Sequence, residues 1–152
     1  MKTGIEKILD VSDDLLSHCY CIVDQTRPGE AVALYHTLRD DIERRGHDLF
    51  VFNGAAFPLG FIKGKILSVP HFAPINQYGI QAKIESLYVD RRYQHAGIGG
   101  MLLAEYEKYC REKDVSAIIL YSAPTPQAKK FYEKFGYKQV NKNLLMLKQL
   151  SR

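Results

Sequence analysis

The stretch between residues 87 and 103 constrains this chain more than any other. It begins with the apolar run Leu87-Tyr88-Val89, passes through a basic turn, and opens through glycines into a segment with helical periodicity. This order predicts a strand, a loop and the start of a helix. The first backbone N–H groups of a helix have no intrahelical partner, and the helix dipole is positive there, so they suit an anion. A phosphorylated cofactor is therefore expected at this loop.

The spacing of these glycines excludes two common nucleotide motifs. A mononucleotide P-loop needs Lys-Ser or Lys-Thr after its glycines, and neither follows here. A dinucleotide fingerprint would need a third glycine where Leu102 stands, and an acidic residue on a second strand about 20 residues later, which is absent. The pattern that fits is Gln/Arg-x-x-Gly-x-Gly/Ala, which is met by Gln94, Gly97 and Gly99.

A second motif lies downstream at residues 125–137, Thr-Pro-Gln-Ala-Lys-Lys-Phe-Tyr-Glu-Lys-Phe-Gly-Tyr. A hydroxyl residue followed by proline predicts the start of a helix, and Gly136 predicts its end. This motif is similar to Asn-x-x-Ala-x-x-Phe-Tyr-x-x-x-Gly-Phe, and the glycine loop resembles the acetyl-CoA pyrophosphate loop, both of the GNAT superfamily of N-acetyltransferases. The two motifs span about residues 80 to 140. Thr125 replaces the frequent Asn of the family, which keeps the helix cap but puts in doubt a side-chain contact to CoA.

Hydrophobic periodicity predicts the element order βααβββαβαββ, which also matches the GNAT fold. The resemblance implies an α/β architecture with a mixed central sheet, splayed at the cofactor site and flanked by helices, in a single domain over residues 1–152. The expected elements are a strand at about 3–10, a helix after Ser12, a helix over 31–42, strands at 49–52, 59–69 and 80–89, a helix ending near 113–114, a strand at 115–121, a helix at 125–136, and strands at 137–140 and 144–150.

Composition narrows the class of protein further. A chain of 152 residues that is 46% hydrophobic can form one domain with a proper core. Because it has no apolar run near the roughly 20 residues of a membrane span and no signal peptide, we expect a cytoplasmic protein with no membrane partner. The net charge of +4 is scattered, so no nucleic-acid partner is expected. The three cysteines and five histidines show no metal-ligand spacing, so no metal is expected. The oligomeric state is left open, with a homodimer as one alternative.

The resemblance implies acetyl-CoA as the cosubstrate. Backbone groups of Leu87 and Val89 would pair with the pantetheine arm, and the amides from Gln94 to Gly100 would hold the pyrophosphate. Arg91, Arg92 and Lys130 are candidates for outer phosphate contacts, with a solvated basic face as the alternative. The residues expected at the cofactor are Leu87, Tyr88, Val89, Gln94, His95, Ala96, Gly97, Ile98, Gly99, Gly100, Thr125 and Lys130.

Two side chains are candidates for the chemistry. Acetyl transfer to an amine needs a neutral amine, and Glu85, in an otherwise apolar strand, could remove the amine proton, directly or through water. The alternative for Glu85 is a solvent-facing position on a half-exposed strand. Tyr132 matches the tyrosine that protonates the CoA sulfur in many GNAT enzymes. The alternative for Tyr132 is a place in the core stripe of its helix, and both can hold at once.

The acceptor cannot be named from sequence. By analogy with the fold, Asp24, Arg27 and Glu30 would rim its site together with His71, Phe72 and Tyr78. The expected function is an N-acetyltransferase that moves acetyl from acetyl-CoA to a primary amine of a small molecule, by direct attack in a ternary complex. The alternatives are acetylation of a protein N-terminus or lysine, and a non-catalytic CoA-binding regulatory module.

Overall fold

The structure, a computed structural model, describes residues 4–67 and 79–150 and divides into two compact units. Unit 1 contains Met1–Gly64 and Ser86–Tyr106, and unit 2 contains Lys65–Glu85 and Glu107–Arg152. The expectation of a single domain over residues 1–152 stays a prediction. The expected loop from residue 70, with His71, Phe72 and Tyr78, lies outside the described residues.

In the described residues the observed element order is the predicted one, βααβββαβαββ, with a 3₁₀ helix added. The strands form a seven-stranded mixed sheet in the order β1-β2-β3-β4-β5-β7-β6, which confirms the predicted α/β architecture with a mixed central sheet. In chain order the elements are β1 (Gly4–Ile8), α1 (Asp13–Asp24), α2 (Pro28–Glu43), β2 (Asp48–Asn53), β3 (Pro58–Ile66), β4 (Gln81–Val89), a 3₁₀ helix (Arg91–Tyr93), α3 (Ile98–Glu112), β5 (Ala117–Tyr121), α4 (Pro126–Lys134), β6 (Lys138–Gln139) and β7 (Leu145–Gln149).

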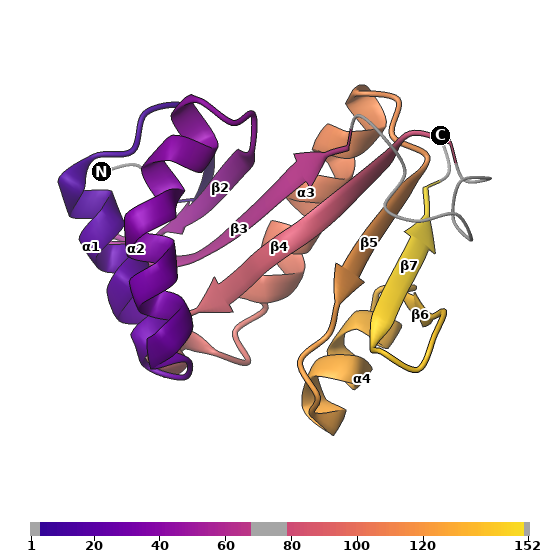
Figure 1. Cartoon of the computed structure of the whole chain (residues 1–152). Helices are drawn as coiled ribbons and strands as arrows, with labels where there is room; N and C mark the ends of the chain where they lie inside the picture. Colours follow the sequence, from indigo (N-terminus) through magenta and orange to yellow (C-terminus); the bar gives the residue numbers. More distant parts are fainter. Residues whose placement is uncertain (1–3, 68–78, 151–152) are drawn as a thin grey trace. The chain divides into compact units, whose positions relative to one another are not determined.

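Unit 1 is built from two helices packed against antiparallel strands. Strands β1, β2 and the first part of β3 pair antiparallel, and α1 and α2 lie side by side (Figure 1). Ser12 starts α1, because its hydroxyl accepts the N–H of Leu15 at 3.1 Å. The apolar face of α1 is buried, and it joins Ala31 and Leu38 of α2 and Phe61 of β3 in one core.

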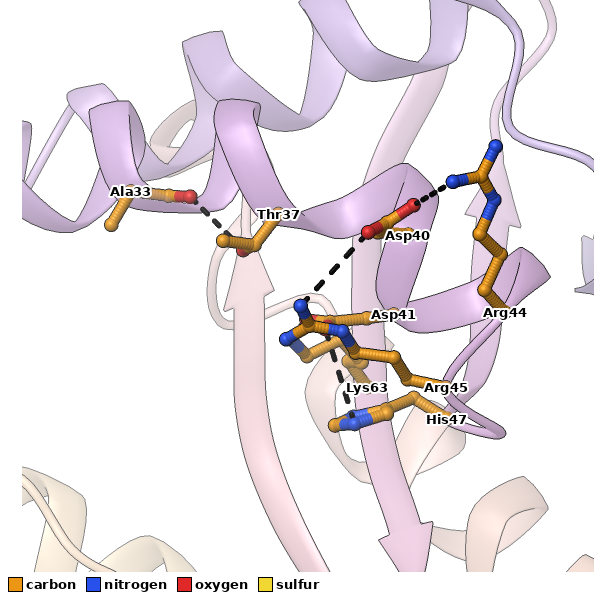
Figure 2. Close-up of polar contacts among 8 residues, drawn as sticks. All are labelled: Ala33, Thr37, Asp40, Asp41, Arg44, Arg45, His47 and Lys63. Atoms are coloured by element: carbon orange, nitrogen blue, oxygen red, sulfur yellow. Dashed lines mark hydrogen bonds and ion pairs between the residues drawn. The ribbon is translucent and has the colours of Figure 1, made fainter.

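A cluster of ion pairs lies at the end of α2, which Figure 2 shows. On the outer side, Asp40 lies 3.5 Å from Arg44. On the inner side, the Asp41 carboxylate accepts a hydrogen bond from the Lys63 ammonium of β3 at 2.7 Å. Both side chains are about nine-tenths buried, with 10% and 9% exposed. A buried charge strongly destabilises the fold when it is unpaired, so the Asp41–Lys63 bond holds α2 against β3.

The β2–β3 connection is longer than the two-residue hairpin turn of which Asn-Gly is typical. Strand β2 ends at Asn53 and β3 begins at Pro58, and the Gly54 N–H donates to the Phe57 carbonyl at 3.0 Å. On β3, a Cβ on Gly60 would lie 2.9 Å from the Tyr88 carbonyl oxygen of β4. Glycine at this position therefore lets β3 and β4 approach.

Unit 2 contains the parallel part of the sheet. Residues 81–84 of β4 pair in parallel with residues 117–120 of β5, and β7 pairs antiparallel with both β5 and β6. The β5 residues from Ala117 to Leu120 are all buried, as expected for a continuous apolar run. The strand predicted at 137–140 is shorter, since β6 contains only Lys138 and Gln139.

Candidate functional site

The loop after β4 is folded back onto the strand that precedes it. The side-chain amide of Gln94 donates to the Val89 carbonyl at 3.3 Å, and the Asp90 N–H donates to the Leu59 carbonyl of β3 at 2.7 Å. The Asp90 carboxylate accepts the backbone N–H of Arg92 at 3.0 Å and so starts the 3₁₀ helix. The first residue of the predicted loop motif, Gln94, thus anchors the loop within unit 1.

The backbone of the loop turns twice through left-handed conformations before α3 begins. His95 has φ of 68° and Gly97 has φ of 84°, a region that glycine enters without steric cost. The Gly97 carbonyl accepts the first helical hydrogen bond, from the Met101 N–H at 3.0 Å. The amides of Ile98, Gly99 and Gly100 therefore precede the first intrahelical bond, as at other helix starts.

We call the loop from Gln94 to Gly97 and the first amides of α3 the cradle, and its loop is open to solvent. All residues from Arg91 to Gly97 are exposed, and a Cβ built on Gly97 would meet nothing within 4 Å. The conformation itself favours glycine here, since positive φ disfavours any side chain at position 97. An exposed helix start preceded by left-handed residues fits an anionic group such as a pyrophosphate.

The two arginines beside the loop have protein partners. The Arg92 guanidinium donates to the Asp90 carboxylate at 2.9 Å and lies 5.4 Å from the centre of the Phe57 ring. The hydrogen bond from Arg92 lowers the pKa of Asp90. The Arg91 guanidinium donates to the Gln25 carbonyl. These contacts favour a role in holding the loop over a role as free phosphate ligands.

Within unit 1, the last part of β4 is also tied to the junction of α1 and α2. The Tyr88 hydroxyl donates to the Glu30 carboxylate, which also accepts the Arg27 guanidinium at 2.6 Å. The hydrogen bond from Tyr88 lowers the pKa of Glu30, whereas burial and then Glu30 raise the pKa of Tyr88. Arg27 and Glu30 were expected near the acceptor, but the sequence did not indicate their link to Tyr88.

In unit 2, Tyr132 lies on α4 between two aromatic rings. Its ring centre lies 5.1 Å from that of Phe131 and 5.8 Å from that of Tyr137. Burial raises the pKa of Tyr132 to about 12. Within the described part of the chain no group forms a hydrogen bond with the Tyr132 hydroxyl, whereas the hydroxyls of Tyr88 and Tyr137 each donate to a carboxylate.

The remaining predicted residues of unit 2 lie on α4 and β4. The Thr125 hydroxyl accepts the Ala128 N–H at 3.2 Å, which confirms the predicted helix cap. Lys130 is exposed on the same helix, and Glu85 is exposed on β4. The structure therefore places Glu85, Thr125, Lys130 and Tyr132 in unit 2 and the glycine loop in unit 1.

With this geometry in place, comparison with known proteins identifies the family. Residues 13–137 match the family model described as acetyltransferase (GNAT) family. The chain belongs to the GNAT acetyltransferase family. This membership confirms the resemblance seen in the two motifs, and it makes the chain an acetyltransferase whose donor is acetyl-CoA.

Solved GNAT structures share the fold at low sequence identity. An aminoglycoside 6'-N-acetyltransferase complexed with coenzyme A has a TM-score of 0.78 at 17% identity, over 97% of this chain and 98% of its own. The PaiA N-acetyltransferase from Thermoplasma acidophilum, in complex with coenzyme A, has a TM-score of 0.71 at 22% identity, over 97% of this chain and 100% of its own. A GNAT acetyltransferase from Staphylococcus aureus has a TM-score of 0.74 at 14% identity, over 97% of this chain and 100% of its own. No curated protein matches the sequence.

This GNAT chain also carries a buried polar cluster that sequence reasoning missed. The Tyr137 hydroxyl donates to one oxygen of Glu107 at 2.9 Å, and the Lys148 ammonium donates to the other at 2.9 Å. The available signal was the position of Glu107 on α3. It lies four residues after Leu103 and three before Cys110, a spacing that places all three residues on one face of a helix.

Among residues 4–67 and 79–150, no group of histidine, cysteine, aspartate or glutamate side chains could hold a metal ion. In the same residues, no helix is long and apolar enough to cross a membrane. Cys19 and Cys110 are buried, and burial raises the pKa of Cys19 to about 12. Cys21, by contrast, is exposed.

Proposed function

We propose that this acetyltransferase moves the acetyl group of acetyl-CoA to a primary amine of a small molecule, by direct attack in a ternary complex. The observation that carries the proposal is the exposed cradle after β4. Left-handed His95 and Gly97 lead directly into the first amides of α3. This backbone suits a pyrophosphate, which is the polyanionic part of the donor.

The chain would hold the donor largely through its backbone. The amides from Gln94 to Gly100 surround the pyrophosphate, and backbone groups of Leu87 and Val89 pair with the pantetheine arm as a strand would. The Gln94 side chain occupies the Val89 carbonyl at 3.3 Å, so Val89 would offer its N–H group. Thr125 and Lys130 are the α4 candidates for contacts with the donor.

Acetyl-CoA supplies a thioester whose carbonyl carbon accepts the amine. The Glu85 carboxylate takes a proton from the acceptor ammonium, directly or through water, so that a neutral nitrogen can form the new C–N bond. The Val89 N–H, or a neighbouring one, stabilises the negative charge that develops on the carbonyl oxygen. Tyr132 donates its hydroxyl proton to the sulfur as the C–S bond breaks, and the phenolate is reprotonated, directly or through solvent, by the proton that the nitrogen of the new C–N bond loses as the amide forms.

Two observations support a small, polar acceptor. First, the solved structures of similar fold include two aminoglycoside 6'-acetyltransferases. Second, the charged pair expected to rim the acceptor is accessible, since the side chains of Arg27 and Glu30 are 40% and 54% exposed. An accessible carboxylate and guanidinium can bind the polar substituents of a small amine.

The test measures thiol release from acetyl-CoA in the presence of aminoglycosides, polyamines, amino acids and peptides. We expect turnover with a small amine, and Tyr132→Phe should lower it about 100-fold while leaving CoA binding unchanged. Tyr35→Phe is a matched control, because Tyr35 is an exposed tyrosine of α2.

Three outcomes would contradict the proposal. Turnover with peptides alone would assign a protein acceptor. CoA binding without turnover on any acceptor would support the non-catalytic alternative. Equal rates for the parent and Tyr132→Phe would remove the acid role from Tyr132 while leaving the acetyl transfer itself in place.

A further inference from the structure

The C-terminal end of α4 fixes Tyr132 through a defined backbone motif. The Tyr137 N–H donates to the Tyr132 carbonyl at 3.1 Å, and the Gly136 N–H donates to the Glu133 carbonyl at 3.0 Å. Gly136 has φ of 93°. These two bonds and the left-handed glycine define a Schellman motif, in which the residue after the glycine packs on the residue five positions earlier. The edge-to-face contact of the Tyr137 and Tyr132 rings, with centres 5.8 Å apart, is that packing contact.

Tyr137 is itself held from two other elements. It is 1% exposed, and its hydroxyl donates to Glu107 of α3 at 2.9 Å. The Lys148 ammonium of β7 donates to the second oxygen of Glu107 at 2.9 Å and lies 5.7 Å from the centre of the Tyr137 ring. The Arg111 guanidinium lies 3.9 Å from the same carboxylate. The Glu107 carboxylate thus has one donor on each oxygen, so its orientation is fixed.

We infer that Glu107 is a positioning residue for Tyr132. It acts through Tyr137, whose ring forms one wall beside the Tyr132 ring, and it therefore sets where the Tyr132 hydroxyl points. The inference rests on the proposed acid role of Tyr132. All the residues concerned belong to unit 2.

The size of the expected effect follows from the geometry of proton transfer. A catalytic acid must come within hydrogen-bond distance of the atom that it protonates, so a small rotation of the phenol lowers the rate. The affinity for acetyl-CoA depends on other groups and should be unchanged when the phenol rotates. The signature of a positioning residue is therefore a lower kcat with an unchanged KM for acetyl-CoA.

The test is a double-mutant cycle between Glu107→Gln and Tyr132→Phe. A glutamine has one acceptor oxygen for two donors, so either Tyr137 or Lys148 loses its bond. We expect Glu107→Gln to lower kcat about 10-fold in the parent and by less than about 2-fold in the Tyr132→Phe background, because its effect passes through Tyr132.

Asp41→Asn is the matched control. It removes the charge from a group of the same kind, a buried carboxylate that accepts a lysine ammonium at 2.7 Å in unit 1 (Figure 2). It should leave kcat within about 2-fold of the parent, because the side chain of Asp41 pairs with Lys63 and His47, neither of which belongs to the proposed site. If Glu107→Gln fails to fold, Tyr137→Phe replaces it, with the same expected change in kcat, since that variant removes the Tyr137–Glu107 bond and keeps the ring contact with Tyr132.

A second measurement does not depend on acetyl transfer. In protein labelled with 3-fluorotyrosine, the ¹⁹F resonance of Tyr132 is the one that disappears in Tyr132→Phe. We expect this resonance to shift in Glu107→Gln and to stay in place in Asp41→Asn. An unshifted resonance overturns the inference, and so does a loss of kcat that is equally large in both backgrounds. If no acceptor gives turnover, the proposed function fails, and the ¹⁹F shift alone decides whether Glu107 positions Tyr132.

Discussion

Two phenol–carboxylate pairs in this chain use the same chemistry in opposite environments. In unit 2, Tyr137 donates to Glu107, whose side chain is 8% exposed. In unit 1, Tyr88 donates to Glu30, whose side chain is 54% exposed. Each carboxylate also has a basic partner, Lys148 and Arg27 respectively. Because water can replace a lost partner only at the exposed pair, the buried pair should stabilise the fold more and the exposed pair should adapt more easily to a ligand.

The largest expected difference is in the free energy of unfolding. Glu107→Ala leaves the Lys148 ammonium and the Tyr137 hydroxyl without their carboxylate, and it should lower the stability by about 3–5 kcal/mol. Glu30→Ala should cost less than about 1 kcal/mol, because solvent screens an exposed pair. Urea denaturation of both variants measures the difference. Equal losses would show that burial does not distinguish the two pairs.

Removing the hydroxyl group of each tyrosine should lower the stability less, and the larger loss should again be at the buried pair. Tyr137→Phe keeps the ring contact with Tyr132 but leaves one buried oxygen of Glu107 without its donor, at a cost of about 1–3 kcal/mol. Tyr88→Phe should cost less, because water can reach the Glu30 carboxylate. Thermal unfolding of the two variants ranks them, and a larger loss for Tyr88→Phe would reverse the interpretation.

One glycine with positive φ in each unit can be replaced to test the backbone there. Each replacement should lower the free energy of unfolding by about 1–2 kcal/mol. Gly97→Ala and Gly136→Ala both place a side chain at positive φ, 84° and 93° respectively. At Gly136 the new Cβ would also lie 3.4 Å from the Lys148 side chain. We expect Gly97→Ala to weaken CoA binding and Gly136→Ala to lower kcat, and calorimetric titration with CoA separates the two effects. Tight CoA binding by Gly97→Ala would argue against the cradle.

The smallest expected effect concerns the pH dependence of the rate, which should not fall at alkaline pH. Tyr132, unlike Tyr88 and Tyr137, has no carboxylate partner among the described residues, and burial alone raises its pKa to about 12. An acid must be protonated to act, and at pH 9 only about one Tyr132 in a thousand would be ionised. The rate should therefore rise as the acceptor amine loses its proton and stay level to about pH 10. A fall beginning near pH 8 in a pH–kcat profile would exclude Tyr132 as the acid.

The elements and the glycine loop after β4 could be predicted because their signals are local. The Thr125 cap bonds to a residue three positions away, and Gly136 ends the helix that follows. The spacing of Gln94, Gly97 and Gly99 favoured the CoA-loop pattern over the nucleotide patterns, and with the second motif it indicated the family that the comparison confirms. Local signals were weaker at the β2–β3 turn and at β6, where pairing with a neighbouring strand sets the length.

What the sequence determined by itself was therefore the order of elements, the loop and the donor. The tertiary structure decided the partners of the charged and phenolic groups, because those partners come from distant parts of the chain. Tyr88 and Glu30 are 58 positions apart, Tyr137 and Glu107 are 30 apart, and Lys148 and Glu107 are 41 apart. Periodicity shows that a position such as 107 will be buried, but only packing shows which charges and hydroxyls it meets there.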